Sequence, residues 1–152
     1  MSQKDELRRM KFGVKFETQS VANAAAFNTA HTTTNLDTQG FETNMFLLTV
    51  NTIGNTPDYV FKVYETDVSV TDAGTAADAA NVIAVRSDDT NTKITGGVIT
   101  ETANADEGKM YIIEYAGCAR WIRLQCTTGT KTATFGLQTL QMHARRTFYT
   151  HA

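Results

Sequence analysis

The residue types that most often carry catalysis or bind metals are few in this chain, and their spacing matches no common motif. The histidines are His31, His143 and His151, and none has a partner at metal-ligand spacing. Cys118 and Cys126 form no CxxC pair and no acid–base motif accompanies them, which favours turn or buried cysteines over nucleophiles. The sequence therefore predicts no catalytic residues, no metal site and no cofactor.

Acidic side chains could also bind a ligand, because carboxylate oxygens suit calcium. They gather between Glu65 and Asp89, but their spacing matches no calcium-binding loop, so solvated loop acids are the favoured interpretation. No set of residues supplies a nucleophile, a base and an orienting group together, and the chain does not read as an enzyme.

Arg120, Trp121 and Arg123 form the most distinctive cluster in the sequence. The period of a strand places Ile122 and Leu124 on a buried face and turns Trp121 and Arg123 outward. Two interpretations stay open. An outward aromatic beside a guanidinium is typical of a protein interface. The same side chains could instead cover their own sheet through cross-strand pairing.

The residues just before this cluster predict a tight turn. Tyr115 ends one apolar run and Gly117 permits the chain to reverse, so the following run would return as the second strand of a hairpin. In that hairpin Arg123 would offset the charge of Glu114 or Asp106.

A second basic cluster lies at the C-terminal end, where Arg145 and Arg146 stand beside Phe148 and Tyr149. Such a mixture could contact bases or a protein groove. The whole chain has 14 Lys and Arg against 16 Asp and Glu, so it has no basic surplus to attract nucleic acid. We expect no nucleic-acid partner, and a protein contact or a pair of arginines that extend along the surface to water is favoured.

Short alternating runs separated by turn residues fill the chain from His31 onward, and they predict the framework that positions these clusters. Candidate strands cover residues 32–36, 43–51, 58–66, 82–86, 97–100, 109–115, 119–127 and 131–144. This pattern predicts an all-β fold, an antiparallel β-sandwich of jelly-roll-like type. Alternation places inside it Met45 or Phe46, Phe61, Val63, Ile122, Leu124 and Phe135.

The last predicted strand changes its apolar phase. Phe135 and Leu137 share one parity, whereas Leu140 and Met142 share the other. A bulge near residues 138–139 would bring both pairs to the core.

The first 28 residues differ from the rest, because a short alternating run is followed by small, almost uncharged residues without Gly or Pro. One interpretation is an extended N-terminal arm, residues 1–28, ahead of a sandwich domain at 29–152. The arm would carry Phe12, Val14, Phe16 and Phe27 to a neighbouring subunit. An ordinary first strand followed by a loop is the alternative.

Membrane insertion and export are not expected. The longest apolar runs, such as residues 45–50, are far shorter than the ~20 residues of a membrane helix. The N-terminus carries charges where a signal peptide needs an apolar stretch. We expect a protein made in the cytoplasm, with no membrane partner.

Four segments also carry an ordered pattern: residues 37–50 (DTQGFETNMFLLTV), 59–67 (YVFKVYETD), 111–126 (YIIEYAGCARWIRLQC) and 142–146 (MHARR). Within them stand Gly40-Phe41, Glu65 with Asp67, Tyr115 with Gly117, and Arg120-Trp121-Ile122-Arg123. As an ordered set they resemble a family of small virion-associated structural proteins of tailed bacteriophages.

The resemblance implies a β-sandwich without catalytic residues that acts as a head decoration or cement protein. Its location would be the virion head, and its partner would be the major capsid protein of the same virion. It would also associate with itself as a homo-oligomer, and multivalent contacts to a symmetric shell would supply the binding energy.

Two alternatives stay open. A neck, tail or fibre-attachment component would have the same fold. A carbohydrate-binding sandwich would use Trp121, Tyr64 and Tyr111 as exposed stacking platforms.

Overall fold

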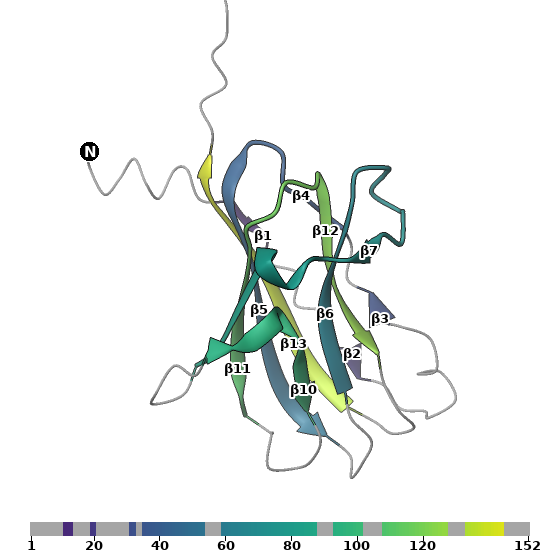
Figure 1. The fold of residues 1–152 in the computed structure, drawn as a ribbon. Helices are drawn as coiled ribbons and strands as arrows, with labels where there is room; N and C mark the ends of the chain where they lie inside the picture. Colours follow the sequence, from purple (N-terminus) through teal and green to yellow (C-terminus); the bar gives the residue numbers. More distant parts are fainter. Residues whose placement is uncertain are drawn as a thin grey trace, which may run out of the picture.

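The chain folds into two antiparallel β-sheets packed face to face, a β-sandwich as the sequence predicts (Figure 1). The computed structural model describes residues 11–13, 19–20, 31–32, 35–53, 59–87, 93–101, 108–127 and 133–144. Figure 1 shows β5 and β11 in the layer on the left and β6 and β12 in the layer on the right. Within the described ranges, no helix has the length and apolarity that a bilayer crossing needs.

The larger sheet, sheet A, has the strand order β1-β13-β5-β11-β8-β9, with β2 also paired to β13. Its strands are β1 (Lys11–Gly13), β2 (Gln19–Ser20), β5 (Phe41–Ile53), β8 (Val82–Ser87), β9 (Lys93–Ile94), β11 (Met110–Tyr115) and β13 (Ala133–Ala144). The long strands β5 and β13 pair along most of their length and form the centre of this sheet.

The second sheet, sheet B, has the order β10-β6-β12-β3, with β4 on β12 and β7 on β6. Its strands are β3 (His31–Thr32), β4 (Leu36–Asp37), β6 (Tyr59–Thr66), β7 (Thr75–Ala76), β10 (Ile99–Glu101) and β12 (Trp121–Thr127). The segment predicted as one strand at 32–36 thus supplies two short strands that pair with opposite ends of β12. Of the short 3₁₀ turns in the described ranges, η2 (Ala79–Asn81) precedes β8 and η3 (Thr95–Gly97) lies between β9 and β10.

The core lies between the sheets and contains the residues that alternation places there. Phe46, Phe61, Val63, Ile122, Leu124 and Phe135 are all buried, and Met45 is the member of its pair that faces outward. The rings of Phe61 in sheet B and Phe135 in sheet A meet edge to face, with centroids 5.2 Å apart. Such a pair contributes about 0.5–1.5 kcal/mol beyond its buried area.

The bulge predicted near residues 138–139 is wrong. The pairing of β13 with β5 is regular from Phe135 to Met142, and its register shift lies between Thr134 and Phe135. The phase change has another cause. Leu140 and Met142 lie on the outer face of sheet A, so β13 is apolar on both faces.

The N-terminal residues extend sheet A at one edge. In β1, Phe12 pairs with Leu140, and β2 pairs with β13 farther along. The other residues of the predicted arm lie outside the described ranges. The arm and the jelly-roll subtype therefore stay predictions.

Candidate interaction surfaces

The chain passes from sheet A to sheet B at a corner built around Tyr115. This side chain is buried, its hydroxyl donates to the Glu65 carboxylate of β6, and the Ala119 N–H donates to that hydroxyl at 3.0 Å. Burial, and after it the hydrogen bond to Glu65, raises the pKa of Tyr115 well above its ordinary value. The phenol therefore joins the two sheets and fixes the start of the next strand.

The hairpin predicted here is wrong, because β11 pairs with β5 and β8 whereas β12 pairs with strands of sheet B. Gly117 also serves a different purpose from the one expected. It does not have a positive φ, but a β-carbon at this position would overlap the Tyr115 phenol. The glycine makes room for the ring that holds the corner.

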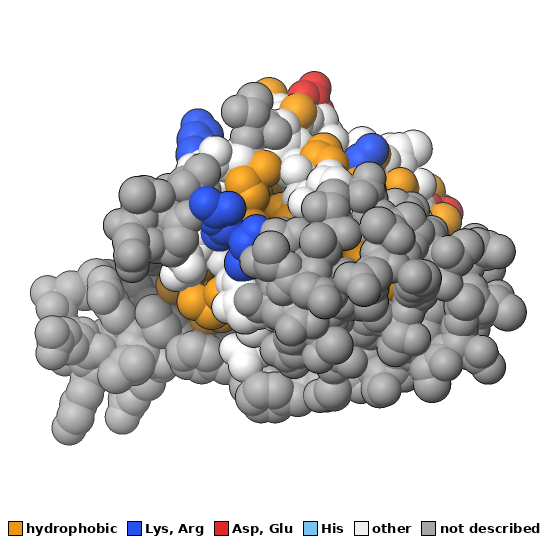
Figure 2. Space-filling view, turned by 90° about the horizontal axis from the view of Figure 1, so that it is seen from below, with side chains coloured by type: hydrophobic (Ala, Val, Ile, Leu, Met, Phe, Trp, Pro, Cys, Tyr) orange, Lys and Arg blue, Asp and Glu red, His pale blue; other side chains and the backbone are white. Residues whose placement is uncertain are grey.

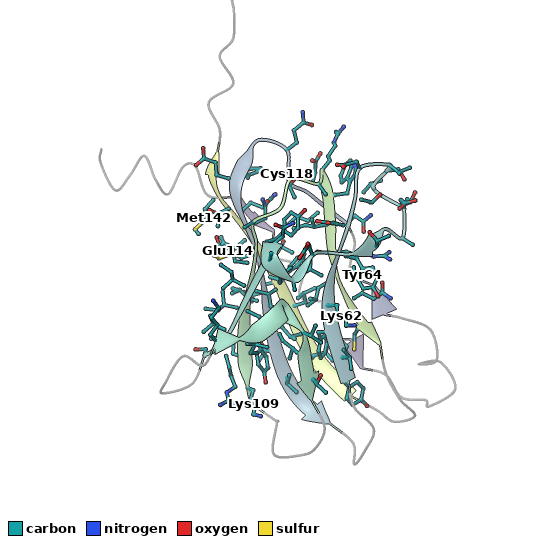
Figure 3. All side chains as sticks on the ribbon, viewed as in Figure 1. Lys62, Tyr64, Lys109, Glu114, Cys118 and Met142 are labelled. Atoms are coloured by element: carbon teal, nitrogen blue, oxygen red, sulfur yellow. The ribbon has the colours of Figure 1, made fainter. Side chains whose placement is uncertain are left out.

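The first candidate surface is the outer face of sheet B, here called the Arg–Trp face. It consists of Trp121, Arg123 and Gln125 of β12 with Tyr64 and Lys62 of β6. Arg123 is the register partner of Tyr64, and Gln125 is the register partner of Lys62. The outward direction of Trp121 and Arg123 confirms the parity prediction, as does the burial of their neighbours Ile122 and Leu124. Figure 3 shows Lys62 and Tyr64 on the right of the sandwich.

Each aromatic ring on the Arg–Trp face has a guanidinium over it. The Arg120 guanidinium carbon lies 4.9 Å from the Trp121 ring centroid, and that of Arg123 lies 5.5 Å from the Tyr64 centroid. Such cation–π contacts contribute about 0.5–1 kcal/mol at exposed sites. The rings are thus already covered on one side.

Arg123 is fixed further by the loop that follows β6. One of its terminal nitrogens donates to the Ala73 carbonyl and, at 3.1 Å, to the Gln125 side chain. Its Nε is buried and has no hydrogen-bond partner within the described part of the chain. The predicted contact with Glu114 is wrong, because Glu114 lies on the other sheet and on its outer face (Figure 3). Asp106, the other predicted partner, lies outside the described ranges.

Arg120 stands at the corner where β12 begins. Its backbone N–H donates to the Asp67 carboxylate at 2.8 Å, and its guanidinium lies 3.5 Å from the Asp37 carboxylate. Both partners of the guanidinium pair are partly exposed, so the ion pair contributes little to stability. The arrangement does orient Arg120 over Trp121.

These contacts bear on the carbohydrate alternative. Tyr111 is only 3% exposed, because it shares the inward parity of Ile113 and Tyr115, so its expected role as an exposed platform is wrong. Trp121 and Tyr64 do lie on one face, but the arginines occupy one side of each ring.

The second candidate surface is the outer face of sheet A, here called the apolar face. Its members share the outward parity of four neighbouring strands: Leu140 and Met142 of β13, Met45 and Leu47 of β5, Met110 and Ile112 of β11, and Ile83 and Val85 of β8. Ile83, Met110 and Ile112 are 40%, 39% and 36% exposed. Figure 3 shows Met142 on the left of the sandwich, opposite Tyr64 and Lys62.

Pairing brings these side chains into rows across the sheet. One row runs Leu140, Met45, Glu114, Ile83, and the next runs Gln138, Leu47, Ile112, Val85, Lys93. Our sequence reasoning missed this surface. The signal was present in the uninterrupted apolar runs of β5, β8 and β11.

One end of the sandwich has a hollow lined by basic and apolar side chains. Its lining residues are Arg86, Lys109, Ile94, Val98, Ile99, Thr100 and Tyr111. Figure 2 views this end and shows Lys and Arg side chains beside hydrophobic ones.

The acidic residues and cysteines form no metal centre among the residues described. Glu65, Asp67 and Asp72 border a shallow hollow beside Gly74 at the opposite end of the sandwich. Cys118 is exposed in the corner, whereas Cys126 is buried. Burial raises the pKa of the Cys126 thiol to about 12, so this thiol stays protonated in the folded protein at neutral pH.

The remaining predicted interface residues stay predictions. Val14, Phe16, Phe27, Arg145 and Arg146 lie outside the described ranges, and Phe12 is placed only as a strand position beside Leu140.

No protein-family model, characterised protein or solved structure matches this chain.

Proposed function

We propose that this chain is a structural subunit of a tailed-phage head, a decoration or cement protein that attaches to the outside of the shell. The observation that carries the proposal is the apolar face of sheet A. An antiparallel sheet that faces water alternates apolar and polar residues. Here four neighbouring strands instead turn Leu, Ile, Val and Met side chains outward, which favours a protein that works while covered by another protein.

The size of this face favours an assembly held together by many contacts. At about 4.8 Å between strands and about 3.4 Å per residue the face measures roughly 400 Å², and covering its apolar part at about 25 cal/mol per Å² contributes less than about 10 kcal/mol. That gain is comparable with the cost of immobilising two proteins, about 4–15 kcal/mol. A single contact of this kind is weak, whereas many copies that contact one another and a symmetric shell gain strength through avidity.

The location in a phage head comes from the ordered resemblance of residues 37–146 to virion-associated proteins. The residues behind that resemblance have structural roles that fit a non-enzymatic subunit. Tyr115 and Gly117 build the corner between the sheets, Glu65 accepts the Tyr115 hydrogen bond, and Asp67 accepts the Arg120 N–H.

The test is an add-back experiment with particles of the phage that encodes the chain. Heads and tails prepared without the protein are purified separately and mixed with increasing amounts of the purified chain. We expect the chain to sediment with heads, to saturate at a fixed number of copies per head, and to appear as discrete density outside the shell in image reconstructions.

Binding to tails or necks and not to heads would overturn the head assignment in favour of a neck, tail or fibre-attachment component. Binding to neither particle, together with retention on a glycan surface, would favour the carbohydrate-binding alternative.

A further inference from the structure

We infer that the apolar face is the contact between two copies of this chain, packed face to face about a two-fold axis. The inference rests on the proposed function, because it names the partner that covers the apolar face in the proposed assembly. It leaves the Arg–Trp face of each copy directed away from the contact.

The strands of sheet A have the composition of strands covered on both sides. Residues 45–48 of β5 read MFLL, residues 82–85 of β8 read VIAV, and residues 110–113 of β11 read MYII. Strands buried on both faces have such near-continuous apolar runs. Sheet B differs, since Lys62 interrupts β6 and Arg123 and Gln125 interrupt β12.

A second copy fits this face in shape. Two sheets pack well when their twists match, at about 10 Å separation and about 30° between strand directions, and identical sheets have the same twist. A two-fold contact uses one patch twice, so no second complementary surface is needed. Met45, Met110 and Met142 also lie on this face, and flexible thioether side chains adapt to a facing surface.

Charge favours a second copy over an unrelated apolar partner. Among the described strand residues, the charged side chains on this face are Glu114 of β11 and Lys93 of β9. Covering Glu114 with a purely apolar surface would leave a carboxylate without a partner, which is costly. A second copy brings its own Lys93 to the same interface, so the face is electrically self-complementary.

The area sets the expected strength. At about 4.8 Å between strands and about 3.4 Å per residue, the part of β13, β5, β11 and β8 between Met142 and Met110 covers roughly 400 Å² in each copy. Two such faces fall at the weak end of specific interfaces, below about 1,200 Å² in total. The dimer should therefore dissociate at micromolar concentrations in solution and be reinforced on a shell by avidity.

The experiment measures the sedimentation of the purified full chain over a range of concentrations. We expect a monomer–dimer equilibrium for the wild type. Ile112→Asp places a carboxylate in the apolar face and should weaken the dimer at least tenfold. Val68→Asp is the matched control, because Val68 is 79% exposed in the loop after β6 and lies away from this face. It should dimerise as the wild type does.

Circular dichroism and melting temperature establish that each variant is folded. Should Ile112→Asp fail to fold, Ile83→Asp on β8 tests the same face. Charge reversal gives an independent check, since Glu114→Lys and Lys93→Glu should each weaken the dimer several-fold and their combination should restore it. If a different protein covered this face, the chain would form no dimer for the combined charge reversal to restore.

Three results would overturn the inference: a wild-type chain that stays monomeric at about 0.1 mM, a folded Ile112→Asp variant that dimerises as tightly as wild type, or equal weakening by Val68→Asp. If the wild type is monomeric and Ile112→Asp weakens head binding while Val68→Asp does not, the shell protein occupies the face instead. A dimer that binds no head would leave this inference intact and contradict the proposed function, so the two can fail separately.

Discussion

The phenol of Tyr115 occupies the space that a β-carbon of residue 117 would take, and this relationship fixes the corner between the two sheets. Because residue 117 is glycine, the ring can fold back beneath the turn. Its hydroxyl then meets the Ala119 N–H and the Glu65 carboxylate. Both residues of the Tyr-x-Gly pair therefore act together, and neither should tolerate replacement well.

Gly117→Ala should destabilise the fold. The added methyl group would overlap the Tyr115 ring, and overpacking of this kind typically costs about 1–3 kcal/mol. Urea unfolding measures the change. Gly136→Ala in β13 is the matched control, because its new β-carbon would meet only Thr49 at an ordinary 3.9 Å. We expect the control to stay within about 0.5 kcal/mol of wild type. Equal effects of the two substitutions would contradict the steric account of Gly117.

Tyr115→Phe should destabilise the protein by about 1–3 kcal/mol, because it removes the hydroxyl that both Glu65 and the Ala119 N–H contact. Tyr64→Phe makes the same chemical change on the outer face and should cost much less. A double-mutant cycle of Tyr115→Phe with Glu65→Gln isolates the pair. We expect the two changes to be clearly non-additive, and strict additivity would show that the Glu65 contact contributes nothing to stability.

Much of the framework could be predicted from the sequence, because strand alternation reports burial directly. The inward positions of Phe61, Val63 and Leu124 follow from a period of two, and turn residues mark the ends of the strands. The alternation says nothing about which sheet a strand joins. For this reason the Tyr115 to Trp121 connection, which crosses between the sheets, was predicted as a hairpin.

The surfaces were harder to predict for a physical reason. A run that is apolar on both parities cannot show which face is the core and which is the outside. Leu140 and Met142 were therefore directed inward by a supposed bulge, and the apolar face was missed. Contacts between strands distant in sequence, such as Arg123 over Tyr64, become visible only once the register is known.

Stability should fall at alkaline pH through Cys126. Burial raises the pKa of this thiol to about 12 in the folded protein, whereas an unfolded cysteine titrates near ~8.5. The unfolded state therefore loses its proton first, so the stabilisation is complete below about pH 8.5 and declines as pH rises toward 12. The loss at pH ~10 should be about 2 kcal/mol.

Denaturant unfolding at neutral pH and at pH ~10, under reducing conditions, measures this decline. Tyr59 and Tyr115, whose pKa values burial also raises, add to the decline at still higher pH. Cys126→Ala is less stable at every pH but should lose far less between the two conditions. An unchanged pH dependence in that variant would assign the decline to other groups.

Trp121→Ala tests whether the Arg–Trp face contacts the shell. The side chain is only partly buried, the Arg120 guanidinium lies over its ring, and its register partners on the neighbouring strands are Asp37 and Thr66. If the two-fold contact uses sheet A, this face of each copy stays available for the shell, and an aromatic beside arginine is a favoured interface composition. We expect binding to heads to weaken by about 2 kcal/mol, or roughly 30-fold in Kd.

The unfolding free energy of Trp121→Ala should fall by less than about 1 kcal/mol. Lys62→Ala on the same face serves as a control for a side chain without a ring. A lower melting temperature with unchanged head binding would show that Trp121 only covers its own sheet, and the shell contact would then have to lie elsewhere.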